Sequence, residues 1–261
     1  MRKNHPKRGE KEEIRLNRFL ALCGVGSRRA CDDYIAQGRI EVNGEMITSM
    51  GTRISPESDI VKFDGSIVMP TDNFIYILLN KPLFTVSTVQ DEKGRKTVID
   101  LINLSARLFP VGRLDFNTTG VLLVTNDGEF SYFLTHPSFE IKKIYRALIN
   151  KHIRPIDLHY LQKGIVLDGK KTSPCKIQEL RIINNCSYLE VELHEGRNRQ
   201  IKRMFQALDY QVEQLDRVNF AGLGVGDLKK GEWRELTSAE VSRLNGLIEQ
   251  QKSKIFEKVS E

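Results

Sequence analysis

The chain has 261 residues, of which 40% are apolar, enough for one large domain or two modest domains with a true core. Its 40 Lys and Arg residues outnumber its 34 Asp and Glu residues, and the formal net charge of +6 suits a polyanionic partner. No apolar run approaches the ~20 residues of a membrane span, and the charged N-terminus lacks a secretory signal. We therefore expect a cytoplasmic protein with no membrane attachment.

The four cysteines indicate a reducing compartment. Cys23, Cys31, Cys175 and Cys186 form no Cys-x-x-Cys pair, and no histidine pair has the spacing of metal ligands. We expect them to be reduced thiols that pack as small apolar groups. Walker and Gly-x-Gly-x-x-Gly patterns are also missing, so we predict neither a metal nor any other cofactor.

The N-terminal residues 1–13 are predicted to form a basic disordered tail. Four basic residues, Arg2, Lys3, Lys7 and Arg8, precede the first acidic residue. Such a segment is either a solvated chain end or an arm that touches phosphates, and the sequence leaves both open.

Residues 14–66 are predicted to form a small domain of two helices and a hairpin. Apolar spacing over 14–22 predicts a short amphipathic helix, and Ser27 is a good N-cap for a second one. Gly38 stands where a helix-ending glycine belongs, and Asn43-Gly44 is a strong hairpin signal. A linker is predicted at 67–73.

Three arginines in this domain point to phosphate contacts. Arg28 and Arg29 open the second helix, and Arg39 follows it. Two cations at a helix start oppose the helix dipole, at a cost of some tenths of a kcal/mol each, which suggests a functional reason for them.

This first domain resembles the S4 RNA-binding domain. The resemblance rests on Arg15-Leu16-Asn17-Arg18-Phe19-Leu20, Gly26-Ser27-Arg28-Arg29 and the segment from Gly38 to Gly44. It implies an αL-type module that docks on structured RNA.

Residues 74–250 are predicted to form a second, larger domain, and residues 251–261 a helix end or tail. A buried strand over 74–79 ends at Lys81-Pro82, because proline cannot donate to a ladder. The pattern then predicts a helix over 97–108; strands over 121–125, 142–149, 173–179 and 187–193; and helices over 129–135, 156–163, 197–208 and 238–257. This irregular mixture indicates an α+β fold with a mixed, mostly antiparallel sheet.

The stretch from Gly112 to Gly128 is the most informative part of this domain. Arg113 and Asp115 lie in a turn bracketed by glycines, and an apolar segment follows. A carboxylate on a tight loop against a β-framework suits chemistry on a sugar. Taken alone, Asp115 fits an Asx-turn residue better than a nucleophile.

Further segments accompany this stretch along the chain. They are Leu79-Asn80-Lys81-Pro82, Leu134-Thr135-His136-Pro137, Lys143-Ile144-Tyr145, and the segments from Glu195 to Met204 and from Gly231 to Leu236. In this order they resemble the RsuA/RluB-type ribosomal RNA pseudouridine synthases, in which an S4 domain precedes the catalytic domain. The resemblance covers nearly all of residues 14–245.

The resemblance implies a role for each matching residue. Asp115 matches the essential aspartate, and Arg113 matches an arginine that helps fill the space left by a flipped nucleotide. Tyr145 matches the tyrosine that stacks on the target base, and Ile201 an aliphatic residue packed beside it. Lys202 matches a basic partner of the aspartate; because a lysine stands here, we expect a point-charge contact and not a bidentate one.

The chemistry of uridine isomerisation is consistent with these roles. The N1–C1′ bond must break, the uracil must turn, and C5 must bond to C1′. An ionised carboxylate can attack C1′ or take the C2′ proton, and the sequence leaves this choice open. A nearby cation keeps the carboxylate charged, and an aromatic face offsets the cost of unstacking the base. The basic residues Arg197, Arg199 and Arg203 are predicted to contact RNA.

The predicted activity is therefore the isomerisation of a uridine in ribosomal RNA, in the large-subunit (23S) RNA, by a monomer acting on the RNA or on an assembly intermediate. Three alternatives stay open. They are the same reaction on small-subunit (16S) RNA, a non-catalytic assembly factor, and a glycosidase with Asp127 or Glu129 as second carboxylate. His136 and Trp233 are expected to be structural, and Asp127 a turn residue.

Overall fold

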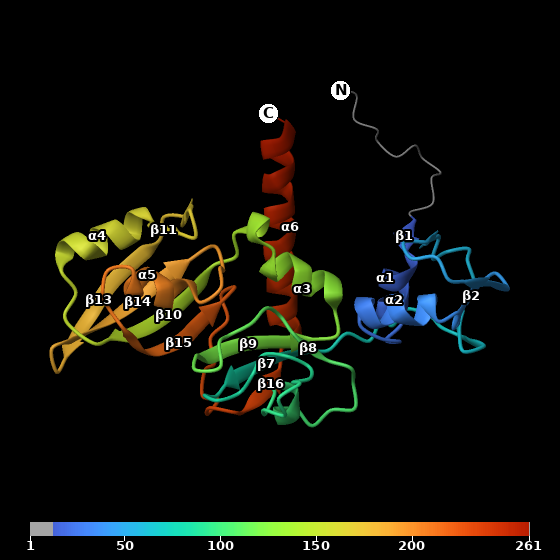
Figure 1. Ribbon diagram of the computed structural model, residues 1–261, viewed down its shortest axis with the longest axis horizontal. Coiled ribbons are helices and arrows are strands. Elements are labelled where there is room, and N and C mark those ends of the chain that lie inside the picture. The colour runs from blue at the N-terminus through green and yellow to red at the C-terminus, as the bar shows by residue number, and fades with distance from the viewer. Residues whose placement is uncertain (1–12, 261) are drawn as a thin grey trace. The chain divides into compact units, whose positions relative to one another are not determined.

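The computed structural model describes residues 13–260, and the chain divides into two compact units after Phe74. Except for Glu13, the expected tail of residues 1–13 lies outside the described residues. In Figure 1 the first unit is blue to cyan, and the second runs from green to red.

The first unit combines two helices with short strands. Helices α1 (Leu16–Leu22) and α2 (Arg28–Ala36) pack on each other over a core that includes Leu16, Phe19 and Ile35. A four-stranded sheet has the order β3 (Glu45–Ile47), β2 (Ile40–Val42), β5 (Val61–Phe63), β6 (Ser66–Ile67), and β1 (Ile14–Arg15) pairs with β4 (Arg53–Ile54).

The local signals of this unit are confirmed. Ser27 accepts a hydrogen bond from the backbone N–H of Ala30 at 3.1 Å and caps α2. Gly38 has φ +68°, and Asn43 and Gly44 both have positive φ in the turn between β2 and β3. The predicted linker at 67–73 overlaps this unit, because Ile67 ends β6 and Val68 packs against the core.

The second unit is built on one long mixed sheet. Its strand order is β13-β14-β10-β15-β9-β7-β16, with β8 beside β9, and all pairs are antiparallel except β15 with β9. The strands are β7 (Tyr76–Lys81), β8 (Phe109–Pro110), β9 (Thr119–Thr125), β10 (Lys143–Ile149), β13 (Lys176–Ile183), β14 (Cys186–Leu193), β15 (Val212–Phe220) and β16 (Trp233–Glu235). The expected α+β class with a mostly antiparallel sheet is confirmed.

Helices cover this sheet in two groups (Figure 1). Helices α4 (Pro155–Lys163) and α5 (Gln200–Gln206) pack on the half formed by β10, β13, β14 and β15, and a small hairpin, β11 (Val166–Leu167) with β12 (Lys170–Lys171), adjoins them. Helices α3 (Gly128–Thr135) and α6 (Ser238–Ser260) pack on β7 and β9. The 3-10 turn η2 (Pro137–Phe139) joins the second group.

The alternating side chains of β7 and β9 separate the two faces of their half. Leu78 and Leu123 join the core under α3 and α6, whereas Leu79 and Leu122 pack against the loops before β9. Tyr145 contacts both this loop-side core and the core beneath α4 and α5. The loop that carries Asp115 and the N-terminus of α5 therefore share a face of the sheet.

Two predicted helices are wrong in extent. Over 97–108 the structure has only the 3-10 turn η1 (Ile99–Leu101), because the preceding backbone pairs with the loop near Val86 through N–H to O bonds of 2.9 and 3.0 Å. The helix predicted over 197–208 spans only Gln200–Gln206. It starts late because Arg199 has φ +48°, outside the helical region.

Candidate active site

Asp115 lies on a tight loop that leads into β9. Gly112 opens the loop with φ +71°, and the N–H of Thr118 donates to the carbonyl of Asp115 at 3.0 Å. The side chain of Asp115 is 30% exposed, so its carboxylate faces solvent from a supported position.

Lys81, at the end of β7, holds this loop from within. Its side chain is fully buried, and Nζ donates to the carbonyls of Pro82 (3.0 Å), Asp115 (3.1 Å) and Thr118 (2.9 Å). Burial lowers the pKa of Lys81 to about 8, while the Asp115 carboxylate opposes this shift. One ammonium group therefore fixes the backbone on both sides of the loop.

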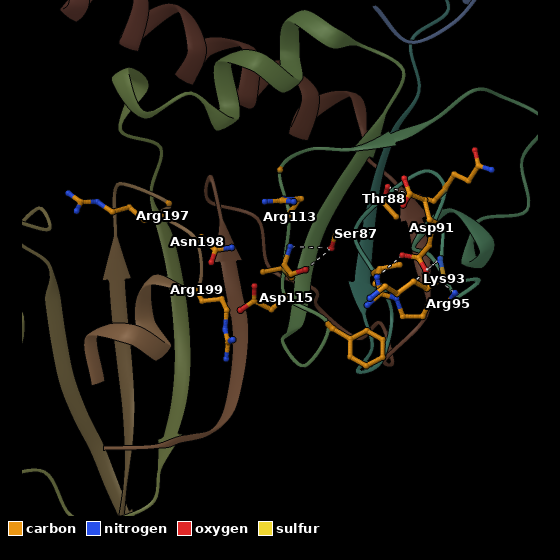
Figure 2. A pocket seen from close by; sticks show the side chains of 17 residues that line it. Ser87, Thr88, Asp91, Lys93, Arg95, Arg113, Asp115, Arg197, Asn198 and Arg199 are labelled. Carbon is orange, nitrogen blue, oxygen red and sulfur yellow. Dashed lines mark hydrogen bonds and ion pairs between the residues drawn. The ribbon is translucent and has the colours of Figure 1, made fainter. Parts of the chain in front are cut away.

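Ser87 fixes the residue before Asp115. Its Oγ donates to the carbonyl of Leu114 at 2.9 Å and accepts from the N–H of Leu114 at 3.1 Å (Figure 2). The hydroxyl thus satisfies both backbone polar groups of the buried Leu114, which would otherwise need a paired strand.

Gly120 permits the close approach of β9 to β15 next to the loop. A Cβ at this position would lie 2.2 Å from the carbonyl oxygen of Arg217, and φ is +107°. Arg217 also donates through Nε to the carbonyl of Val121 at 2.8 Å. The parallel pairing of β9 with β15 therefore requires glycine at position 120. This pairing fixes the start of β9 next to the Asp115 loop.

Lys202, on α5, faces Asp115. Its Nζ lies 3.5 Å from Oδ2 of Asp115, and its side chain is 10% exposed. The same ammonium donates to the side-chain oxygen of Asn117. Burial lowers the pKa of Lys202, and the negative charge of Asp115 counteracts this effect. The contact is a single charge-to-charge contact, as a lysine predicts.

A cleft of about 680 Å³ surrounds the carboxylate. In Figure 2, Arg113 and Asp115 lie between a group formed by Arg197, Asn198 and Arg199 and a group formed by Thr88, Asp91, Lys93 and Arg95. A smaller adjoining hollow is lined by Arg113, Asp115, Tyr145 and Ile201, among others. The structure therefore brings together all five residues that the resemblance assigned to the substrate site.

The predicted RNA-contacting residues near the cleft differ in their surroundings. Arg197 donates to the carbonyls of Lys170 and Lys171 and contacts Glu195, and Arg203 pairs with Asp168. Arg199 is exposed, and its side chain has no hydrogen bond or ion pair within residues 13–260. Of these arginines, Arg199 is best placed to meet a phosphate.

The three arginines of the first unit also differ. Arg28 and Arg29 are exposed at the start of α2. The guanidinium of Arg39 is bound by Asp64 and lies 4.6 Å from the ring centroids of both Tyr34 and Phe63. Arg39 thus has a structural role, because it joins Asp64 to the rings of Tyr34 and Phe63 within the first unit.

Three residues outside the cleft are structural. Asp127 caps α3 by accepting from the N–H groups of Glu129 and Phe130, and His136 accepts from the N–H of Ser138. Trp233 packs against the loop-side cores of β7 and β9. Neither Asp127 nor Glu129 lines the cleft, so the structure gives no support to a glycosidase pair there.

Sequence reasoning did not find three supporting residues: Lys81, Ser87 and Asn117. Lys81 marked the end of a strand and stood in one of the resembling segments, but it was given no role. A lysine at the end of an apolar run can be buried, and its ammonium then needs acceptors. The described residues contain no group of three or more side chains able to hold a metal ion, and no described helix could cross a bilayer.

Sequence profiles of two families match the chain. The S4 domain matches residues 14–61, and the RNA pseudouridylate synthase family matches residues 75–207. The class is thus an RNA-binding module joined to a pseudouridine synthase domain, and the expected S4 resemblance is confirmed.

Individual relatives agree with this class. The chain is 41% identical over 243 residues to the ribosomal large subunit pseudouridine synthase B of Bacillus subtilis, covering 92% of this chain and 98% of the relative. It is 32% identical to the dual-specificity RNA pseudouridine synthase RluF of Escherichia coli, covering 93% and 82%. A crystal structure of a pseudouridylate synthase matches with a TM-score of 0.63 at 29% identity, covering 88% and 99%. The chain therefore belongs to the RsuA/RluB-type pseudouridine synthases.

Proposed function

We propose that this chain converts a uridine of large-subunit (23S) ribosomal RNA to pseudouridine. The observation that carries the proposal is the Asp115 carboxylate, which is exposed to a cleft, supported from behind by Lys81, and 3.5 Å from Lys202. The large-subunit target is supported by the name of the Bacillus subtilis relative. The protein acts as a cytoplasmic monomer, on the RNA or on an assembly intermediate.

Asp115 works at the ribose of a nucleotide that has left its stack. Its carboxylate either attacks C1′ as the N1–C1′ bond breaks or removes the C2′ proton. The freed uracil then turns, C5 bonds to C1′, the C5 proton is lost, and N1 gains a proton. The reaction is an isomerisation, so no atom is added and no electron acceptor is needed.

Lys202 directs the carboxylate. Its ammonium lies 3.5 Å from Oδ2 and attracts that oxygen by charge. Asn117 accepts from the same Nζ and so limits where the lysine can go. The pair thus positions one carboxylate oxygen for the sugar.

The remaining residues of the smaller hollow receive the base. Tyr145 offers an aromatic face, and such stacking offsets about 1–3 kcal/mol of the cost of eversion. Ile201 is buried and packs beside it. Arg113, exposed at the rim, reaches toward the position that the flipped nucleotide leaves. Arg199, Arg28 and Arg29 contact phosphates.

The test is Asp115→Asn, which keeps the shape of the side chain and removes its charge. We expect the rate of pseudouridine formation to fall by at least about 10³-fold while RNA affinity changes little, because the carboxylate reacts and does not hold the RNA. Glu92→Gln, at the rim of the same cleft, is the matched control and should keep the activity. The measurement is pseudouridine mapping by carbodiimide in cells that carry only the variant.

Mapping both ribosomal RNAs in a strain without the gene, against its parent, identifies the target. Loss of a pseudouridine in the small-subunit RNA alone would reassign the substrate, and an unchanged map in the Asp115→Asn strain would end the enzymatic proposal. Equal growth with the variant but no modification would favour a binding role.

The role of Asp115 can be decided with an isotope. A substrate deuterated at C2′ reacts more slowly if the carboxylate removes that hydrogen in a slow step. Equal rates for the two substrates favour attack on C1′.

A further inference from the structure

Two exposed aromatic rings lie next to the candidate nucleophile. Phe84 is 65% exposed and Phe116 is 39% exposed, and their ring centroids are 5.6 Å apart at an interplanar angle of 57°. Phe116 directly follows Asp115 and lines the cleft. The N–H of Phe84 donates to the carbonyl of Phe116 at 2.8 Å, which fixes the two residues relative to each other.

The backbone of Phe84 is strained. Its φ of +56° lies in the left-handed region, which is unfavourable for a bulky side chain. Burial does not compensate for this strain, because most of the ring faces solvent. Residues held in such conformations cluster at binding and catalytic sites, so the exposed ring indicates a ligand and not a folding role.

A cation is held beside the aromatic pair. The guanidinium carbon of Arg95 lies 5.8 Å from the centroid of Phe116. Asp91 accepts from Arg95 at 2.6 Å and 3.1 Å, and these bonds hold the pKa of Asp91 well below its usual range. Lys93 lies on the same side of the cleft (Figure 2). A ring pair with cations beside it matches a nucleotide, which joins an aromatic base to a phosphate.

We propose that Phe84 and Phe116 form a stacking platform for an unpaired base that neighbours the target uridine in the RNA chain. The proposal rests on the proposed function and adds a substrate requirement to it. The platform begins one residue, about 3.8 Å between Cα atoms, from Asp115, so it receives a base adjacent to the everted uridine. Lys93, which is exposed and whose ammonium has no hydrogen bond or ion pair among residues 13–260, meets a neighbouring phosphate.

This platform selects unpaired structure more than sequence. Every base has a π-face, so stacking tolerates any base, but a base inside a duplex cannot reach the rings. The substrate is therefore a loop, bulge or strand end in which a nucleotide beside the target is also unpaired.

The test compares two RNA stem-loops with the whole protein. One has a loop of uridines, and in the other every loop residue except one uridine is abasic. We expect Phe84→Ala to weaken binding of the uridine loop by roughly 5- to 150-fold, the loss of one stacked base. Its affinity for the abasic loop should equal that of the unchanged protein, because there is no base to stack.

Two further variants separate stacking from folding. Phe84→Gly also removes the ring but suits a positive φ, so its thermal midpoint should not fall below that of Phe84→Ala while its RNA affinity falls equally. Leu83→Ala, 48% exposed in the same loop, should bind both RNAs normally.

Equal losses on both RNAs, or no loss on the uridine loop, would overturn the platform. These binding results do not depend on Asp115 chemistry. A failure of the proposed function would instead appear as an unchanged pseudouridine map in the Asp115→Asn strain.

Discussion

At the scale of single residues, the position of the Asp115 carboxylate depends on how the backbone carbonyls of its loop are held. Asp115 and Lys202 share one contact of 3.5 Å, which leaves both side chains some freedom. The backbone of the Asp115 loop has much less freedom, because Lys81 binds the carbonyls of Asp115 and Thr118 at the same time. We therefore infer that Lys81 positions the backbone of Asp115, whereas Lys202 orients its carboxylate.

Replacing Lys81 by methionine tests this view. The change keeps an unbranched side chain but leaves three carbonyls without their donor, so we expect the free energy of unfolding to fall by roughly 1–3 kcal/mol. A displacement of Asp115 by about 1 Å should also lower kcat by about 100-fold. Unfolding in urea and single-turnover kinetics measure the two effects.

The control is a change that destabilises the same domain elsewhere. Leu161→Ala, in the buried face of α4, should lower the free energy of unfolding by about 2–5 kcal/mol and leave kcat unchanged at temperatures where the protein is folded. If Lys81→Met also retains kcat, Lys81 supports the fold and does not position Asp115.

At the scale of elements, helix α6 is joined to the edge strand β16 by one carboxylate. Glu240 accepts from two nitrogens of Arg234, each at 2.7 Å, and from the N–H of Thr237 at 2.9 Å. Thr237 in turn accepts from the N–H of Glu240 at 3.2 Å, which completes a reciprocal cap. The hydrogen bonds from Arg234 lower the pKa of Glu240 from 4.5 to about 2.

This pKa predicts how stability depends on pH. The carboxyl binds its proton more weakly in the folded state, so its stabilising effect is complete above pH 4.5 and is lost as the pH falls toward 2. Arg234 is partly exposed, so screening reduces the effect to about 1 kcal/mol. Glu240→Gln should lower the unfolding midpoint at pH 7 and show a shallower decline between pH 4.5 and 2.

The same helix offers a control. Glu249 pairs with Lys252 on the exposed surface of α6, and Glu249→Gln should leave the pH dependence of the unfolding midpoint unchanged. If Glu240→Gln and the unchanged protein decline in parallel below pH 4.5, Glu240 does not carry the proposed effect.

Elements with a local signal could be predicted from sequence, and elements that depend on distant partners could not. Ser27 and Gly38 bound α2 through bonds made within a few residues, so the pattern sufficed. The segment 97–108 has apolar residues that suit a helix, yet its backbone pairs with the loop near Val86. Strand β15 was missed, because its inward Arg217 interrupts the apolar alternation.

The same distinction holds for the site. Asp115, Tyr145 and Lys202 stand in motifs that can be recognised along the chain. The role of Lys81 arises only after folding, because its acceptors lie in two distant segments of the chain. One acceptor is the neighbouring Pro82, and another is Asp115, which is 34 positions further along the chain.

At the scale of the whole molecule, the proposed RNA contacts are divided between two compact units. The net charge of +6 favours any polyanion, but charge that is paired within the protein releases few counterions on binding. The side chains of Arg28 and Arg29 have no hydrogen bond or ion pair in the part of the chain that the structure describes, whereas the Arg39 side chain is bound by Asp64. Arg28 and Arg29 should therefore contribute to the salt dependence of RNA affinity, and Arg39 should not.

Replacing Arg28 and Arg29 together by glutamine should flatten the dependence of RNA affinity on salt. If each contacts a phosphate, the slope of log affinity against log salt should fall in magnitude by about 0.7–0.9 per arginine. Arg39→Gln should leave that slope unchanged and lower the unfolding midpoint, because its guanidinium closes the domain through Asp64, Tyr34 and Phe63. Fluorescence titrations of a labelled RNA stem-loop over a range of salt give the slopes of the unchanged protein, the double variant and Arg39→Gln.

An unchanged slope in the double variant, or a flattened slope in Arg39→Gln, would show that RNA docks on a different face of the first unit.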